Sequence, residues 1–415
     1  MRDKRIVARH LRRNLPASRW REVPDPRGKQ GRRYALPELL QALLIGMCVR
    51  APTLRDVERV VDRLPVRREL GLRGAPSDTT LEGVVRKLTV DPLRAVLRSF
   101  VLGLWRSKQL ESDRLLGISL VAIDGKVLGS DDVQNHPDAY GQGSGEQRRY
   151  ILKALRAVHV SSPVKPALDQ QVIPAGKGEA NTFLPFVDEL LADFGGIGLL
   201  ECITVDAGFT SRENMHGLND RDLGFIAGLK GDQPTLFTEA KRLLGTDDRE
   251  PMDGWQHRTE EVSGSRQVTR WFARTAEMNG WHDWTCIRQT WRIRQRVVCG
   301  GKETWEDRYF ITNLPWGRLS RDQCVRAIRT HWGVENDCFW TLDTQWGEDT
   351  RAWVRKDRAL EVLGLLRLVA YNIVRLLRQR VFRAEDNRTM AWRSLFELVQ
   401  AATTDARAWE PSGIG

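Results

Sequence analysis

Two apolar runs of the sequence each end in an aspartate. The stretch "VAID" places Asp124 after "LLGISL", and "ITVD" places Asp206 after "LLEC". Such runs are typical of buried strands, and α/β proteins build their sites beyond the carboxyl ends of strands. The two carboxylates can share one site if their strands are neighbours. Either Asp taken alone is more simply explained as a turn or cap residue.

A third carboxylate lies on a predicted helix. Seven residues recur at spacings of three and four, and all except Glu335 are apolar: Val325, Ile328, Trp332, Glu335, Phe339, Leu342 and Trp346. This spacing predicts one continuous helical stripe that faces a core. An ionised carboxylate on such a stripe is costly unless it is paired or bound to metal. An ion pair with an arginine is one explanation, and a cleft shared with Asp124 and Asp206 is the other.

Three acids in one cleft would repel one another unless cations neutralised them. Carboxylate oxygens without a His or Cys cluster suit Mg²⁺ or Mn²⁺. Two such ions about 4 Å apart suit phosphoryl transfer, in which one activates the attacking hydroxyl and the other stabilises the leaving oxygen. No P-loop motif occurs in the sequence, so ATP is not the expected source of phosphate.

The charge distribution indicates a polyanionic partner. The net charge is +11, and residues 1–33 hold twelve Lys or Arg against three Asp or Glu, or 12 − 3 = +9. Basic arms of this kind usually contact nucleic acid, although a solvated tail has the same composition. We expect double-stranded DNA as the partner.

Composition also restricts the compartment. No apolar stretch approaches the roughly 20 residues of a membrane helix, and the basic N-terminus has no apolar segment of a secretory signal. The six cysteines are scattered without a CxxC pair, which argues against zinc fingers and a disulfide framework. The expected location is therefore cytoplasmic, without a membrane partner.

The elements that position the acids follow from periodicity. A Pro/Gly/basic linker at 25–33 precedes a helical unit of about 35–110, in which Thr53 and Ser77 are predicted N-caps. That unit fits a helix-turn-helix-like DNA-binding element or an ordinary bundle. Strands then alternate with helices, which argues for an α/β class.

The strands and helices of this α/β part are predicted separately. Predicted strands cover 117–124, 148–162 and the run that ends at Asp206, with a third buried strand from 224, and a helix covers 181–194. Residues 255–312 are rich in β-branched and aromatic types and predict an inserted β-unit. Helix resumes at Leu319 and continues, with an interruption, to about 381. The tail 386–415 gives little signal.

Several blocks resemble the H-repeat-associated insertion-sequence transposases, a DDE family. They are "DPRGKQGRR", "PSDTTLEGVVRKL", "AIDGK", "ITVDAGF", "GLKGDQPTLF", "YFITNLP" and the long block from "IRTHWGVEN" onward. The resemblance spans most of residues 25–380. It implies a ribonuclease H-like catalytic core, a segment inserted before the last acid, and DNA strand transfer. By matched position Asp124, Asp206 and Glu335 would be the catalytic acids and metal ligands, separated by 206 − 124 = 82 and 335 − 206 = 129 residues.

The expected organisation follows from both lines of reasoning. Its parts are a basic arm and linker (1–34), a helical N-terminal domain with a possible role in DNA binding (35–112), a first core part (113–250), an inserted β-rich unit (251–316), a helical core part (317–385) and a tail (386–415). The expected function is that of a DNA transposase of a prokaryotic insertion sequence that uses two Mg²⁺ or Mn²⁺ ions. It would act on element ends and target DNA as a homodimer near the nucleoid. A metal-dependent nuclease and a domesticated DNA-binding protein are the alternatives.

A second group of residues is expected to contact DNA: Lys126, Lys230, Gln233, Arg329 and His331. For Lys126 the alternative is a surface lysine. His331 lies four residues before Glu335 and would contact a scissile phosphate or orient Glu335, unless it is a core-edge histidine bonded to backbone. Asn336 would assist Glu335 or bond the helix surface, and Asp343 and Asp349 are expected to be solvated.

Departures from the family pattern concern the DNA-end contacts. Related families often carry Tyr, Arg and Lys at the positions of Ile328, His331 and Thr341, and this branch more usually has His at the position of Phe339. The loop 129–150 also differs from the family.

Overall fold

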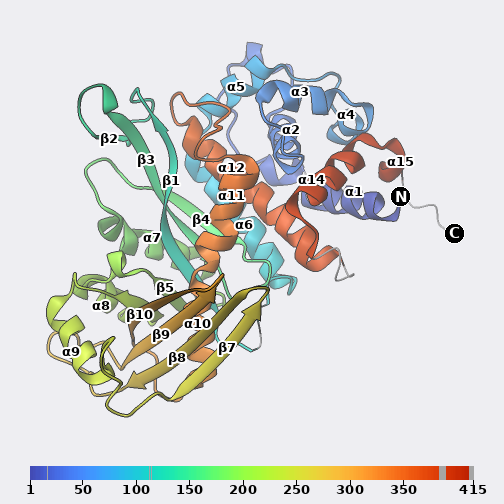
Figure 1. The fold of residues 1–415 in the computed structure, drawn as a ribbon. Helices are drawn as coiled ribbons and strands as arrows, with labels where there is room; N and C mark the ends of the chain where they lie inside the picture. The colour runs from blue at the N-terminus through green and yellow to red at the C-terminus, as the bar shows by residue number, and fades with distance from the viewer. Residues whose placement is uncertain (16, 112, 114, 383–388, 411–415) are drawn as a thin grey trace.

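The computed structural model describes residues 1–15, 17–111, 113, 115–382 and 389–410. It has mixed α/β architecture, with one large mixed sheet and a group of N-terminal helices (Figure 1). The main hydrophobic core includes residues from both parts, from Val7 to Trp409, and a smaller cluster lies around Leu128 and Leu152. The division of the chain into domains stays a prediction.

Ten strands within the described residues form the sheet. They are β1 (Leu120–Asp131), β2 (Tyr140–Gln142), β3 (Arg149–His159), β4 (Ala167–Val172), β5 (Cys202–Val205), β6 (Gly224–Leu229), β7 (His257–Ser263), β8 (Arg266–Thr275), β9 (Gln289–Cys299) and β10 (Lys302–Thr312). Their order is β2-β3-β1-β5-β6-β10-β9-β8-β7, and β4 pairs with β3 beside β2. The strands predicted around 117–124, 148–162, 199–206 and 224 are all present.

β1 lies at the centre of the part that carries both aspartates. It pairs antiparallel with β3 and parallel with β5, and β5 pairs parallel with β6. β1 is longer than predicted, because it continues to Asp131 as an antiparallel ladder with β3. Asp124 is therefore not at the tip of its strand. The parallel pairing with β5 stops at Ala122, so Asp124 lies just beyond the point where β1 and β5 separate.

Strands β7 to β10 form the antiparallel unit predicted for 255–312. Each pairs antiparallel with the next. They do not form a separate sheet, because β10 pairs antiparallel with β6 from Tyr309↔Leu229 to Thr312↔Ile226. The predicted inserted β-unit is therefore continuous with the main sheet, in which β10 occupies an interior position.

The helices connect and cover this sheet. They are α1 (Arg2–Asn14), α2 (Leu36–Cys48), α3 (Leu54–Asp62), α4 (Leu64–Leu70), α5 (Asp78–Lys87), α6 (Val90–Arg106), α7 (Glu179–Phe194), α8 (Arg212–Asn219), α9 (Pro234–Leu244), α10 (Arg321–His331), the π-helix η5 (Val334–Phe339), α11 (Trp340–Trp346), α12 (Ala359–Leu376), the π-helix η6 (Leu377–Val381), α14 (Trp392–Thr404) and α15 (Ala406–Trp409). Thr53 and Ser77 are N-caps as predicted, since their side chains accept hydrogen bonds from Asp56 and Thr80 amides.

Helix α12 joins the two parts of the molecule. All of its residues are buried, as expected for a helix that is covered on every side. It packs against α2, α5 and α6 of the N-terminal helices and against β4 and β1 of the sheet.

The two ends of the chain pack on each other, which differs from the expected arm and tail. Helix α1 contacts α14, α15 and η6, and it buries Val7, Ala8 and Leu11 on one face. Figure 1 shows the blue N-terminal helices beside the red C-terminal ones. The basic arm is therefore a folded helix over residues 2–14. The sequence of the segment 386–415 gives little signal, but its described part, residues 389–410, contains α14 and α15.

No helix in the described part of the chain has both the length and the apolar character needed to cross a membrane.

Candidate active site

Asp124 on β1 and Asp206, the first residue after β5, lie at the same level of two neighbouring parallel strands. The register pairs Ala122 with Thr204, and each aspartate follows two residues later on the same face of its strand. Adjacent strands are about 4.8 Å apart, so the two side chains leave the sheet side by side. The sequence prediction that these acids are neighbours is thus supported by the strand pairing.

Asp124 is the acid with the more unfavourable surroundings. Burial is the main cause that raises its pKa to about 7, and the carboxylates of Asp206 and Glu335 raise it further. The Gly125 amide donates a 2.8 Å hydrogen bond to Asp124 Oδ1 and acts in the opposite direction. The mutual repulsion means that all three acids share one electrostatic neighbourhood.

Asp206 is held by a histidine. His331 Nε2 lies 3.1 Å from Asp206 Oδ1, and its Nδ1 lies 3.2 Å from Thr204 Oγ1. The hydrogen bond from His331 is the largest cause that lowers the pKa of Asp206, although half of the Asp206 side chain is exposed. His331 is buried and contacts Asp206, which none of the roles predicted for it included. The two aspartates therefore differ in pKa: that of Asp124 is raised to about 7, whereas that of Asp206 is lowered.

Glu335 lies on η5 and points to solvent. The predicted continuous stripe is interrupted, because α10 ends at His331 and the next six-residue turn is a π-helix. Val325, Phe339 and Leu342 are buried as predicted, but Glu335 is exposed. The inference that Glu335 faces the core is therefore wrong. An ion pair with an arginine is not its explanation either, since no ion pair of Glu335 occurs within the described residues.

The carboxylates of the site are suitable ligands for a divalent cation, but in this structure they are not close enough together to hold one. Within the described ranges no group of three or more His, Cys, Asp or Glu side chains is close enough together to hold one metal ion. The expected convergence of the three acids at ligand distance is therefore not present. The chemistry of the donors still fits Mg²⁺ or Mn²⁺, because three carboxylates with mutual repulsion are what a hard cation would neutralise.

Lys126 does not face solvent as a DNA ligand would. Its side chain is 9% exposed and its Nζ donates to Asp343 Oδ2 on α11. Asp343 is thus ion-paired rather than solvated as predicted, whereas Asp349 is exposed as predicted.

The other predicted DNA contacts differ in their exposure and in their partners within the protein. Lys230 is exposed, and its charge contributes to the low pKa of Asp206. Gln233 Nε2 donates to the Thr210 carbonyl at 3.0 Å. Arg329 makes a two-pronged ion pair with Glu261 of β7. Of these residues, Lys230 has the most accessible charge.

A basic groove beside Glu335 was not predicted. It encloses about 440 Å³ and is lined by Glu335 together with Lys165, Arg266, Arg270, Arg308 and Arg329. Arg308 also lies over the Trp332 ring, 4.0 Å from its centroid. The arginines of β8 are spaced by four in "RQVTRWFAR" and so share one sheet face, which was the available signal. Because these arginines are far from Glu335 in the sequence, their position beside it could not be predicted.

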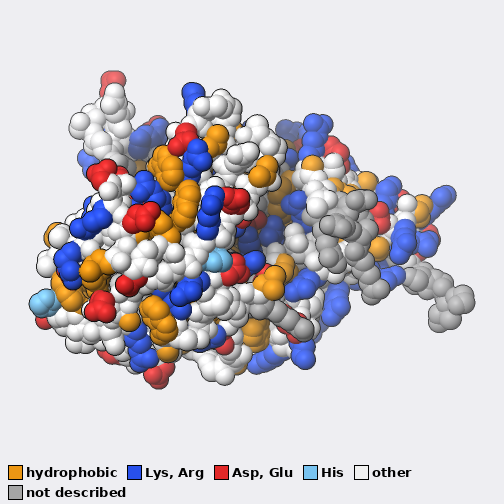
Figure 2. Space-filling model, turned by 60° about the horizontal axis from the view of Figure 1, so that its bottom comes forward, with side chains coloured by type: hydrophobic (Ala, Val, Ile, Leu, Met, Phe, Trp, Pro, Cys, Tyr) orange, Lys and Arg blue, Asp and Glu red, His pale blue; other side chains and the backbone are white. Residues whose placement is uncertain are grey.

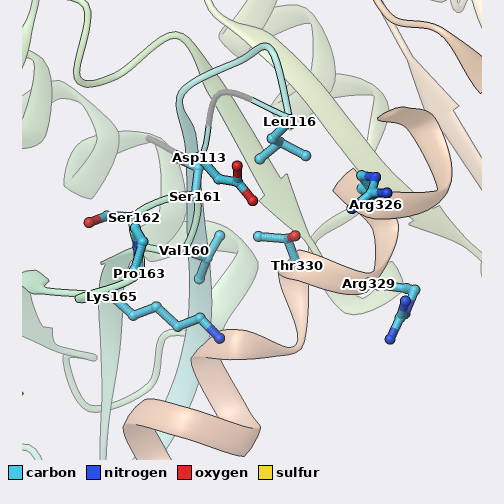
Figure 3. A pocket seen from close by; sticks show the side chains of 10 residues that line it. All are labelled: Asp113, Leu116, Val160, Ser161, Ser162, Pro163, Lys165, Arg326, Arg329 and Thr330. Atoms are coloured by element: carbon cyan, nitrogen blue, oxygen red, sulfur yellow. The ribbon is translucent and has the colours of Figure 1, made fainter. Parts of the chain in front are cut away.

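A second pocket lies beside α10 and shares two residues with this groove. It encloses about 410 Å³, and Lys165 and Arg329 line both cavities. Figure 3 shows Lys165 extending from the loop after β3 toward the helix that carries Thr330 and Arg329. Lys165 Nζ ends at Asp337 of η5. Figure 2 shows Lys and Arg side chains spread across one face of the molecule, with Asp and Glu between them.

Comparison with known proteins identifies the family. The profile described as "Transposase DDE domain" matches residues 116–373. The chain belongs to this family. The match contains Asp124, Asp206 and Glu335, and also strands β7 to β10.

Two relatives from Escherichia coli (strain K12) are similar to part of the chain. They are "H repeat-associated putative transposase YhhI" and "Putative protein YbfL", each 36% identical over 83 residues. The similarity covers 20% of this chain and 20% of either relative, so the chain is matched over about a fifth of the relatives' length. The family resemblance inferred from the sequence is confirmed.

Proposed function

We propose that the chain is a DNA transposase that cleaves DNA strands and joins 3′ ends to target DNA. Asp124, Asp206 and Glu335 are its catalytic carboxylates and metal ligands in this proposal. The main support for this proposal is that the pairing of β1 and β5 brings Asp124 and Asp206 to the same level. Glu335 is near enough to raise the pKa of Asp124. Membership of the transposase DDE domain family implies phosphoryl transfer.

The strand order supports a ribonuclease H-like core. Without β2, the strands on the Asp124 side lie in the order β4-β3-β1-β5-β6. The first three are antiparallel, and β5 and β6 are parallel to β1. In chain order this is a three-strand meander followed by two crossover strands, with both aspartates on the central pair. Strands β7 to β10 follow as the inserted unit of the proposed core.

The three carboxylates have different roles in the proposed site. A bound Mg²⁺ or Mn²⁺ pair would supply an activated hydroxyl and charge neutralisation at the scissile phosphate. Asp206 is kept ionised by His331 and so offers oxygens at neutral pH. Asp124 offers its oxygens once a cation competes with its proton. Glu335 lies on η5. Its exposed side chain makes no ion pair within the described residues, so it would be available to a cation.

Double-stranded DNA is the proposed substrate. The groove that Arg266 and Arg308 line also contains Glu335, and Lys230 lies beyond β6 near Asp206. Cations in such an arrangement suit phosphate contacts without base specificity. A homodimer on DNA remains part of the proposal.

Cleavage and joining test the proposal. The full-length protein is incubated with Mg²⁺, a labelled DNA fragment that carries the gene's own flanks, and a plasmid target. We expect Mg²⁺-dependent cleavage and joining of the labelled 3′ ends to the plasmid. Asp124→Asn, Asp206→Asn and Glu335→Gln should each lower cleavage by about a thousandfold or more, because electrostatic terms of this kind contribute several kcal/mol. DNA binding in EDTA should persist.

The same experiment separates the alternatives. Cleavage without joining would favour a metal-dependent nuclease. Binding without any Mg²⁺-dependent cleavage would favour a domesticated DNA-binding protein. Full cleavage by Asp124→Asn would contradict the carboxylate assignment.

A further inference from the structure

Two ion pairs connect the segment that follows Glu335 to β1, the strand of Asp124, and to its neighbour β3. Lys126, two residues after Asp124 on β1, donates to Asp343 Oδ2 of α11. Arg156 on β3 is the direct cross-strand partner of Asp124. It binds Glu348, two residues after the end of α11, through Nη1–Oε2 at 2.6 Å and Nη2–Oε1 at 2.8 Å.

The pair that involves Arg156 is fully enclosed. The side chains of Arg156 and Glu348 are 0% and 1% exposed. Gln170 Oε1 of β4 accepts hydrogen bonds from Arg156 Nε at 2.9 Å and Nη2 at 2.6 Å. A buried two-pronged pair of this kind holds a fixed geometry, and removal of either partner leaves an uncompensated charge in the core.

Both cations also contact the segment that carries Glu335. Phe339, the last residue of η5, lies four residues after Glu335. Its ring centroid is 5.6 Å from Lys126 Nζ and 5.9 Å from Arg156 Cζ. The strand residues beside Asp124 are therefore in contact with η5 at one end and with α11 at the other.

We infer that Lys126 and Arg156 are positioning residues that hold η5 and α11 against the sheet, so that Glu335 is presented to Asp124 and Asp206. The inference rests on the proposed function, because only a shared site gives this placement a catalytic consequence. It assigns Lys126 to Asp343 rather than to DNA phosphate. The charge of Lys126 is already neutralised by Asp343, and 9% exposure leaves it little access to a phosphate.

Charge exchange at the Lys126–Asp343 pair tests this assignment. The variants are Lys126→Met, Asp343→Asn and the exchanged pair Lys126→Asp with Asp343→Lys. Each single change should lower the single-turnover cleavage rate by about a hundredfold, since a misplacement of about 1 Å has effects of that size. The exchanged pair should recover most of the rate. DNA affinity and its salt dependence, measured in EDTA, should stay within twofold of the wild-type protein.

Two further variants provide a negative control and a test of Arg156. Lys177→Met removes an exposed lysine before α7 and should change none of these quantities. Arg156→Lys keeps the buried charge but cannot reproduce the hydrogen bonds that the planar guanidinium makes to both Glu348 and Gln170, so kcat should fall while KM for DNA is unchanged.

The opposite outcome is equally specific. If Lys126→Met weakens DNA binding, reduces the salt slope by about one counterion, and is not rescued by the exchange, then Lys126 is a phosphate ligand and the assignment is overturned.

Failure of the proposed function would be seen separately, as absence of Mg²⁺-dependent cleavage by the wild-type protein. Hydrogen exchange then decides the positioning role. The amides of residues 334–346 should exchange faster in Lys126→Met and recover in the exchanged pair. Unchanged exchange would overturn the role of Lys126 in holding this segment.

Discussion

Asp124 is destabilised as an anion when the chain folds without a cation. Its pKa rises to about 7, mainly through burial, while Asp206 keeps a lowered pKa through His331. Two neighbouring carboxylates with separated pKa values are typical of sites that bind cations or transfer protons. The sequence predicted the two acids and their proximity. It could not predict His331 as the partner of Asp206, because that contact joins residues 125 positions apart.

The raised pKa predicts a pH-dependent stability. Between pH 4 and 7 the folded chain keeps a proton on Asp124 that the unfolded chain releases, so stability falls as pH rises through this window. Asp124→Asn removes that dependence and should stabilise the metal-free protein at pH 8 by about 4 kcal/mol, with little effect at pH 4, because each pKa unit corresponds to about 1.4 kcal/mol. Urea unfolding in EDTA at the two pH values measures it, and Asp349→Asn at an exposed acid is the control. An equal effect of Asp124→Asn at both pH values would contradict the shift.

The contact between His331 and Asp206 predicts a loss of rate without a loss of DNA binding. His331→Ala removes the donor to Asp206 Oδ1 and should lower cleavage by about tenfold to a hundredfold. His331→Gln can place an amide nitrogen near the same oxygen and should retain more activity. Cleavage rates and DNA affinity in EDTA are measured together. Reduced affinity in both variants would instead make His331 a phosphate ligand.

At the scale of elements, hydrophobic periodicity predicted which segments are helical or extended but not their local departures from ideal geometry. The stripe from Val325 to Trp346 is buried at both ends, so a period of 3.6 residues fits it on average. A π-helix adds one residue to a turn and leaves no hydrophobic signal, which is why the exposure of Glu335 was missed. The length of β1 was missed for a different reason: β3 supplies the ladder that continues it to Asp131, and pairing is not visible in one strand. For the same reason β7 to β10 were predicted as strands, but their union with β6 was not.

The π-helix predicts a strong effect of a single deletion. Removal of exposed Asn336 would convert η5 to ordinary α-helix and turn Glu335 by about 100° relative to α11. We expect cleavage to fall by more than a hundredfold, with near-unchanged helical circular dichroism and DNA binding. Asn336→Ala keeps the number of residues and should cleave at close to the wild-type rate. A deletion variant with full activity would show that η5 does not set the direction of Glu335.

At the scale of the molecule, some cations of the basic N-terminal segment make ion pairs within the protein, and others are exposed to solvent. Lys4 Nζ lies 3.1 Å from Asp405 Oδ2, and Arg12 Nε lies 2.7 Å from Glu69 Oε1. Part of the +9 charge of residues 1–33 is thus neutralised within the chain. Arg2, Arg5 and Arg13 are exposed and make no ion pair within the described residues. These three arginines are the cations of α1 that remain available to a polyanion.

The difference between ion-paired and unpaired cations of α1 gives a test with an internal control. Replacement of Arg2, Arg5 and Arg13 by Gln should weaken DNA binding about tenfold and lower the slope of log affinity against log salt by about 2 to 3, because each phosphate contact releases close to one counterion. Lys4→Gln removes a charge of the same sign from the same helix, but that charge is held by Asp405. It should lower Tm by a degree or two, as a partly exposed ion pair allows, and leave the salt slope unchanged. Fluorescence anisotropy with a labelled duplex at several salt concentrations measures both. If the triple variant keeps the wild-type slope, α1 serves only to hold α14 and α15, and DNA must be bound by the groove beside Glu335 and the helices that follow α1.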